Sequence, residues 1–354
     1  MKNYVSTKLV ILLLLFFNTT VFSQIQKIKD SIINEEKFIE INGIEQWISI
    51  KGNSTKPIIL FLHGGPGSPL SPYSETIYKK IEKEYLIVHW DQRGTGKTFG
   101  KIAPEELTPE FLKENPLSIE LMTKDGLEIV NYVLKTLNKR KLILFGTSWG
   151  SLLGIKMIAK NPELFYAYVG HSQIVQAFID DAFYKRIENI AKKRKDTDAL
   201  NILKKIGNAP FERARDSGKF IKIIKTFEKL NTKAAPNNWY ISTENYNSKI
   251  DEKNRNDGDD YSFINFVGDK KLEIKSMSEN VDLIKENNIF EIPIYFIQGN
   301  EDILTSKEST KKYFHKIKSP KKKYYLVNKA GHEFNTTIIE TQIRIFNKIK
   351  REIE

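Results

Sequence analysis

The stretch Leu142–Ser151, LILFGTSWGS, decides how the chain is organised. Its first four residues are an uninterrupted apolar run, which is typical of a buried strand in a parallel sheet. The residues Gly-Thr-Ser-Trp-Gly follow directly, and Leu152–Lys160 then has the spacing of a helix. Strand, sharp turn and helix in this order predict that the hydroxyl of Ser148 stands clear of the sheet, as a serine nucleophile requires. Gly146 and Gly150 lack a β-carbon, so neighbouring backbone can approach closely.

Outward from this stretch, short apolar strands alternate with helices. The predicted buried strands are Pro57–Leu62, Tyr85–Trp90, Phe165–Val169, Ile292–Ile297 and Tyr324–Val327, and the predicted helices between and after them are Tyr73–Glu84, Ser118–Leu137, Ser306–Ile317 and Asn335–Glu352. Before them, Phe38–Ile41 and Trp47–Ile50 flank an Asn-Gly turn, which predicts an antiparallel pair at the sheet edge. The alternation predicts an α/β fold, with a mainly parallel sheet covered by helices on both faces.

The segment 171–288 has a different pattern, because strand-like runs nearly vanish there. Ile174–Lys195, Asp198–Ile206 and Phe220–Leu230 have helical spacing, and the polar run Asn247–Asp260 predicts an exposed loop. We therefore expect a helical cap inserted into the sheet domain. The expected organisation is a core sheet domain in two parts, 24–170 and 289–354, with the cap insertion at 171–288 and a signal peptide at 1–23.

The N-terminal segment has the pattern of a secretory signal peptide. Lys2 and Lys8 precede the apolar run Leu9–Phe17, which is shorter than the roughly 20 residues that cross a bilayer. Smallish residues around Ser23 predict cleavage before Gln24 and an exported protein, periplasmic or secreted. The alternative is an uncleaved N-terminal anchor. After cleavage we expect no stable membrane insertion.

Composition excludes several kinds of site. The chain of 354 residues has no cysteine, so disulfides, thiolate nucleophiles and cysteine metal sites are impossible. The net charge of +12 comes mainly from scattered lysines, which are densest at Lys316–Lys323. That patch could bind an anionic surface or nucleic acid, and the alternative is a solvated loop. We favour the loop and expect no nucleic-acid partner, because no arginine-rich or aromatic-interleaved motif accompanies it.

A serine hydroxyl needs a base, and the base needs an orienting acid. In open α/β sheets, reactive groups gather beyond the carboxyl ends of the strands. Asp302 and His332 each follow a predicted strand closely, and the chain order Ser148, Asp302, His332 matches that of α/β hydrolases. The alternatives that we weigh are Glu301 for the acid and His171 for the base.

A tetrahedral intermediate also needs two backbone donors for its oxyanion. The amide of Trp149, directly after the serine, is expected to be one of them. The other is expected from the glycine loop His63–Gly67, HGGPG, with Gly65 as first choice and Gly64 as second. The alternative is a tight turn that needs glycine for its shape alone.

Three blocks together resemble the proline iminopeptidase family of serine peptidases within the α/β-hydrolase superfamily. They are His63–Gly67 (HGGPG), Asp91–Gly96 (DQRGTG) and Gly146–Ser151 (GTSWGS), and the resemblance covers about 55–170 and 290–335. It implies an eight-stranded hydrolase sheet with a helical cap, and removal of an N-terminal residue, preferably proline, from short peptides. On matching positions it implies Ser148 as nucleophile, Asp302 and His332 as its partners, and Gly65 and Trp149 as oxyanion donors. It further suggests that Asp91 and Arg93 brace the site.

The expected substrate-binding residues depart from this pattern. The Trp-x-x-Trp-Glu motif that proline-specific members usually carry early in the cap is missing from Ala177–Ile190. An exopeptidase also needs a carboxylate that holds the free ammonium of the substrate. Glu188 and Glu244 are candidates, and the alternative for both is a solvated charge on the cap surface.

The sequence therefore predicts an exported serine hydrolase that releases N-terminal proline, or another N-terminal residue, from short peptides through an acyl-enzyme. The alternative is an esterase or lactonase that uses the same site on small esters. A more remote alternative is a non-catalytic binding protein with this fold. We expect a small peptide or ester as substrate and no metal or organic cofactor. The sequence does not define the oligomeric state.

Overall fold

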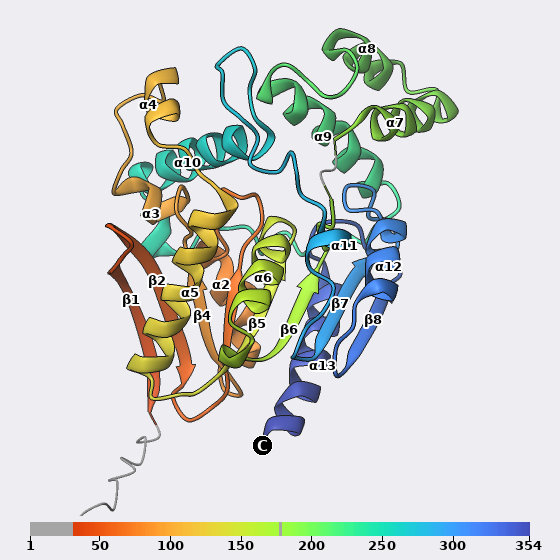
Figure 1. The fold of residues 1–354 in the computed structure, drawn as a ribbon. Coiled ribbons are helices and arrows are strands. Elements are labelled where there is room, and N and C mark those ends of the chain that lie inside the picture. Colours follow the sequence, from red (N-terminus) through yellow and green to blue (C-terminus); the bar gives the residue numbers. More distant parts are fainter. Residues whose placement is uncertain (1–30, 177–178) are drawn as a thin grey trace, which may run out of the picture.

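The computed structural model describes residues 31–176 and 179–354, so the predicted signal peptide lies outside the described residues. Eight strands form one sheet in the order β1-β2-β4-β3-β5-β6-β7-β8 (Figure 1). They are β1 Ile32–Ile41, β2 Ile44–Asn53, β3 Ile58–Leu62, β4 Leu86–Trp90, β5 Leu142–Thr147, β6 Phe165–His171, β7 Ile294–Gly299 and β8 Lys322–Val327. Neighbouring strands from β4 to β8 are parallel, whereas β1 with β2 and β2 with β4 are antiparallel. The predicted mainly parallel sheet of eight strands is confirmed.

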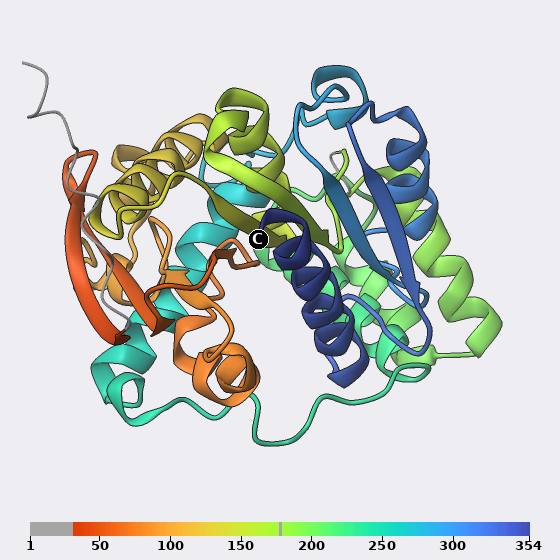
Figure 2. The same ribbon diagram turned by 90° about the horizontal axis from the view of Figure 1, so that it is seen from below.

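Helices cover both faces of the sheet (Figure 2). Those between the strands and after them are α2 Ser74–Tyr78, α3 Gly96–Gly100, α4 Pro109–Glu114, α5 Ile119–Thr136, α6 Trp149–Lys160, α12 Lys307–Lys316 and α13 Thr336–Ile353, with short 3₁₀ turns at Ser71–Tyr73, Lys79–Ile81 and Pro162–Leu164. One buried cluster joins the sheet to α5, α6 and α12, and another joins it to α2 and α13. Among the helices that the structure describes, none is long and apolar enough to cross a membrane.

Strand β5 lies between these two clusters. Leu142 and Leu144 point into the cluster with α5 and α6, whereas Ile143 and Phe145 point into the cluster with α13. All four side chains are fully buried, which explains why the strand is a continuous apolar run. Each such side chain contributes about 1.5–3 kcal/mol by leaving water. The strand that carries Ser148 is therefore a rigid base for the turn that follows it.

The segment between β6 and β7, residues 172–293, is called the insertion below. Its helices are α7 Asp181–Arg194, α8 Thr197–Ile206, α9 Ala214–Lys229, α10 Lys249–Val267 and α11 Leu283–Glu286, with a 3₁₀ turn at Glu244–Tyr246. Helices α7, α8, α9 and α10 lie beyond the carboxyl ends of the parallel strands, whereas α11 lies beside α12 (Figure 1). Helices α7, α8 and α9 enclose a hydrophobic cluster of their own, which includes Tyr184, Leu203 and Phe220.

The polar run Asn247–Asp260, predicted as an exposed loop, is instead mostly helical, because α10 begins at Lys249. Ser248 caps this helix, since its hydroxyl accepts a hydrogen bond from the N–H of Asp251 (3.1 Å). Tertiary packing stabilises the polar first half of α10. Gly258 lies against Phe99 of α3 and against the carbonyl of Gly94, which precedes α3. That contact between distant segments overrides the local polar pattern.

Two glycines within helices give a matched test of the packing around β5. A β-carbon at Gly150 would lie 2.2 Å from the carbonyl oxygen of Leu62, whereas the nearest atom to one at Gly218 is 3.7 Å away. We expect Gly150→Ala to lower the free energy of unfolding by about 1–3 kcal/mol, because backbone must move apart. Gly218→Ala should raise it by up to about 1 kcal/mol through helix propensity. Urea unfolding measures both, and an unchanged midpoint for Gly150→Ala would contradict this packing.

Candidate active site

Ser148 occupies the sharp turn between β5 and α6. Its φ of 51° and ψ of −120° lie outside the ordinary regions for a residue with a side chain. Its N–H donates to the carbonyl of His171 (3.0 Å), and its own carbonyl accepts from the N–H (2.8 Å) and the hydroxyl (2.6 Å) of Ser151. Such strain costs on the order of 1–3 kcal/mol and persists only where the surroundings hold it. Here β6 and the first turn of α6 hold the serine.

The glycines around Ser148 are required by close contacts. A β-carbon at Gly146 would lie 2.3 Å from the carbonyl oxygen of Gly150, and one at Gly64 would lie 3.2 Å from Cβ of Ser148. The first contact allows the chain to reverse direction between strand and helix. The second shows that the glycine loop after β3 lies directly beside the serine. Both glycines come from blocks that the sequence analysis singled out.

His332 meets the serine. Its Nε2 lies 2.9 Å from the Ser148 hydroxyl, a hydrogen-bond distance. Its Nδ1 lies 3.4 Å from Oδ1 of Asp302 and 3.4 Å from the hydroxyl of Thr305. The loops after β5, β7 and β8 thus bring together the three residues that the sequence predicted, although they are far apart in the chain.

Asp302 is held by its own loop. Oδ1 accepts the N–H of Thr305 (2.8 Å), and Oδ2 accepts the Thr305 hydroxyl (2.6 Å) and the side-chain amide of Gln298 (2.9 Å). Burial acts to raise the pKa of this carboxyl, but the charge of His332 and the hydrogen bonds from His332 and Thr305 outweigh it and lower the pKa. The carboxylate is therefore ionised and fixed in direction beside the imidazole.

The same pairing acts on the base. Burial acts to lower the pKa of His332, but the negative charge of Asp302, its hydrogen bond and the charge of Glu228 outweigh burial and raise it above 6.5. A raised pKa means that the imidazole is a stronger proton acceptor. It also means that the imidazole becomes protonated at a higher pH than an isolated histidine.

The weighed alternatives make other contacts. His171 is fully buried, its Nδ1 lies 2.9 Å from the hydroxyl of Thr147, and burial lowers its pKa to about 3. The side chain of Glu301 accepts from the amide of Asn300 (2.9 Å). Neither residue makes the hydrogen bond to Ser148 or His332 that the role would need.

The candidate oxyanion donors lie around Ser148. Gly65 has a φ of 108°, a conformation that favours glycine, and it lines the same cavity as Ser148. Trp149 is the first residue of α6, where backbone N–H groups have no partner within the helix. These two amides, with that of Gly64, are the backbone donors that the sequence predicted for this position.

Gln92 is a bracing residue that sequence reasoning missed. Its side-chain oxygen accepts the indole N–H of Trp149 (2.8 Å), and its side-chain nitrogen donates to the carbonyl of His63 (3.2 Å). It thus joins the glycine loop to the start of α6. Its position inside the Asp91–Gly96 block was the available signal. Asp91 accepts from the Ser71 hydroxyl and from the N–H of Lys97.

Arg93 forms an ion pair with the fully buried Asp125, with 2.6 Å between Nε and Oδ2. Arg93 also donates to the carbonyl of Asn42 (3.2 Å). The Asp91–Gly96 block therefore braces the sheet edge and the site together.

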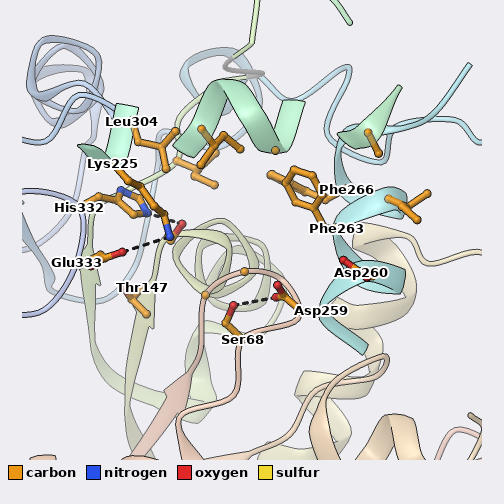
Figure 3. A pocket seen from close by; sticks show the side chains of 18 of the residues that line it. Ser68, Thr147, Lys225, Asp259, Asp260, Phe263, Phe266, Leu304, His332 and Glu333 are labelled. Carbon is orange, nitrogen blue, oxygen red and sulfur yellow. Dashed lines mark hydrogen bonds and ion pairs between the residues drawn. The ribbon is translucent and has the colours of Figure 1, made fainter. Parts of the chain in front are cut away.

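A cavity of about 930 Å³ opens above Ser148 and His332. Figure 3 shows Asp259 and Asp260 of α10 across this cavity from His332, next to Phe263 and Phe266. Asp259 accepts a hydrogen bond from the Ser68 hydroxyl (2.9 Å). Burial and the charges of its neighbours Asp259 and Asp257 raise the pKa of Asp260.

The two carboxylates that the sequence proposed for substrate binding lie elsewhere. Glu188 is on α7 and forms an ion pair with Lys192 (2.7 Å), and Glu244 is exposed in its 3₁₀ turn. Neither lines the cavity, whereas Asp259 and Asp260 do. The prediction of Glu188 and Glu244 at the site is therefore wrong. Because Asn247–Asp260 was predicted as a loop, the face of α10 that lines the cavity could not be recognised. Within residues 31–176 and 179–354, no group of three or more histidine or acidic side chains could hold a metal ion.

Known proteins resemble this chain in sequence and in fold. A protein of Bacillus subtilis (strain 168) named "Probable aminopeptidase YbaC" is 26% identical over 302 residues, covering 84% of this chain and 90% of that protein. The proline iminopeptidase of Neisseria gonorrhoeae is 28% identical over 127 residues, 36% of either chain. The crystal structure of a proline iminopeptidase from Mycobacterium smegmatis superposes with a TM-score of 0.61, covering 90% of this chain and all of that one, at 13% identity.

At such an identity, the superposition shows the fold alone. The family evidence is broader, because the sequence profile of the alpha/beta hydrolase fold matches residues 57–337, from β3 to the start of α13. That span includes the turn at Ser148 and the loops of Asp302 and His332. The chain belongs to the α/β-hydrolase family.

Proposed function

We propose that this protein is a serine hydrolase that releases N-terminal residues from short peptides. The observation that carries the proposal is the 2.9 Å contact between the Ser148 hydroxyl and Nε2 of His332 at the floor of a cavity that also holds two acidic side chains. The relative named a probable aminopeptidase, which matches most of the chain, supports the same reaction class.

In the first half of the reaction, Oγ of Ser148 attacks the carbonyl carbon of the substrate and its proton passes to Nε2 of His332. Asp302 keeps the imidazole in the required tautomer and stabilises its positive charge. The carbonyl oxygen becomes an oxyanion, for which the amides of Trp149 and Gly65 are the proposed donors. When the intermediate collapses, His332 gives the proton to the leaving nitrogen, and the shortened peptide departs.

The second half repeats these steps with water. Water attacks the acyl carbon, and its proton passes to His332. Collapse of the second intermediate breaks the bond to Ser148, and His332 returns the proton to Oγ. The released residue leaves as a free amino acid, and the serine is regenerated.

The acid pair on α10 supports action at a free N-terminus. Asp259 and Asp260 are adjacent in sequence, and their negative charges repel each other. The pKa of Asp260 is raised first by burial and then by the charge of Asp259. Asp257, one turn earlier, is already paired with Lys253 (2.5 Å). A substrate ammonium beside Asp259 and Asp260 would offset their repulsion while the peptide carbonyl rests on Ser148.

A substrate panel tests the reaction class. We expect proline or another aminoacyl anilide to be cleaved, and Ser148→Ala to lower kcat by about 10⁴-fold or more, because the nucleophile is lost. Release of the aniline chromophore measures both. Turnover of short nitrophenyl esters with no cleavage of any aminoacyl anilide would replace the peptidase by an esterase, and absence of all turnover would favour a binding protein.

The pH profile tests the base. The imidazole of His332 must be neutral to accept a proton, and Asp302 raises its pKa against the effect of burial. We therefore expect kcat/KM to fall as pH decreases, with the midpoint of this acid limb above 6.5. A profile that is flat between about pH 5 and pH 8 would contradict His332 as the base.

Paired substrates test the acid pair. The double variant Asp259→Asn, Asp260→Asn should raise KM for aminoacyl anilides about tenfold or more, since charge-assisted hydrogen bonds to the ammonium are lost. KM for a nitrophenyl ester without an amine should stay unchanged. Glu252→Gln, an exposed residue on the same helix but outside the cavity lining, is the matched control. Equal effects on both substrates would show that the pair does not bind the ammonium.

A further inference from the structure

Glu228 is a buried acid whose carboxylate contacts the loops of both Asp302 and His332. It lies near the C-terminal end of α9, in the insertion, and only 4% of its surface is exposed. One oxygen, Oε1, accepts the N–H groups of Ile303 (2.7 Å) and Leu304 (3.0 Å). The other, Oε2, accepts the N–H of His332 (2.9 Å). Nothing in the sequence pattern singles this residue out.

These three donors fix two separate loops to one side chain. Ile303 and Leu304 directly follow Asp302, and the third donor belongs to His332 itself. The neighbouring Gly331 leaves room for this carboxylate, because a β-carbon there would lie only 2.9 Å from Oε2 of Glu228. A single carboxylate therefore sets the spacing between the acid loop and the base loop.

The charge of Glu228 also reaches the imidazole. Burial and the nearby charge of Asp302 raise the pKa of Glu228, while the charge of His332 and the backbone hydrogen bonds from His332 and Leu304 act to lower it. In return, the negative charge of Glu228 favours the protonated form of His332. The protonated imidazole forms whenever Ser148 is attacking.

We propose that Glu228 is a positioning residue for the base: its carboxylate holds the Asp302 and His332 loops together and places a second negative charge beside the imidazole. This inference rests on the proposed roles of Ser148, Asp302 and His332, and it holds for a peptide or an ester substrate. Glu228 is not a substrate ligand, because it is buried, lies outside the cavity lining and already accepts three N–H groups.

Other groups also act on His332 and must be held constant in any test. Asp302 approaches from the loop after β7, Lys225 from α9 and the neutral His171 from the end of β6. Lys225 is itself paired with Glu333, at 3.3 Å. Substitution of Glu228 alone leaves all of these in place.

The test is the rate at which a fluorophosphonate modifies Ser148, measured across pH in the full-length protein. Glu228→Gln keeps the size but removes the charge, and its NH₂ group would face a backbone N–H. We expect the rate to fall about 10- to 100-fold and the acid limb to move to lower pH. Glu188→Gln is the matched control, because Glu188 is paired with Lys192 on α7 and does not contact these loops. It should leave the rate and the acid limb unchanged.

Three results would overturn the inference. They are an unchanged rate in Glu228→Gln, a lower rate with an unmoved acid limb, and equal effects of Glu228→Gln and Glu188→Gln. If Glu228→Gln does not fold, Glu228→Asp replaces it, because it keeps the charge on a shorter arm. We then expect a lower rate with the acid limb near its wild-type position, and a wild-type rate would overturn the inference. Failure of the wild-type protein to react would instead contradict the proposed function.

Discussion

The structure of this site depends on one constraint, the reversal of the chain between β5 and α6 within a single residue. Ser148 takes a positive φ of 51° there, although it is not a glycine. The strain is sustained because β5 is buried on both faces and because Gly146 and Gly150 leave no β-carbon in the way. Because these two residues have no β-carbon, the turn can close tightly. The tight turn places the Ser148 hydroxyl within reach of an imidazole.

The other groups reach that hydroxyl from loops that hold their places through hydrogen bonds between side chains and backbone. Gln92 joins the glycine loop to Trp149, and Thr305 fixes Asp302 within its own loop. Glu228 joins the insertion to the loops of the acid and the base. The insertion is thus tied to the candidate catalytic residues as well as forming one side of the cavity.

The sequence predicted the parts of the site that lie in contiguous blocks. The apolar run at Leu142, the glycines on either side of Ser148 and the polar residues after two strands each have a meaning that local rules capture. The topology that follows from alternating strands and helices then brings the loop tips together. For that reason the sheet, the edge hairpin and the pairing of Ser148 with His332 rather than His171 could be anticipated.

What the sequence could not supply depends on contacts between distant segments. The first half of α10 is polar and lacks an apolar stripe, so the sequence does not indicate a helix there. What stabilises the helix is the packing of Gly258 against α3. The candidates drawn from the sequence were therefore Glu188 and Glu244, whereas the acids that line the cavity are Asp259 and Asp260. Glu228 resembles any other acid in an amphipathic helix, because its three partners are backbone groups and leave no mark in the sequence.

In the proposed mechanism, His332 activates Ser148 for nucleophilic attack. The most direct measurement is to treat the protein with a fluorophosphonate, digest it and locate the modified residue by mass spectrometry. We expect a single adduct on Ser148 that is lost when the reaction is run with His332→Ala. An adduct on another residue, or labelling of Ser148 that does not depend on His332, would contradict it.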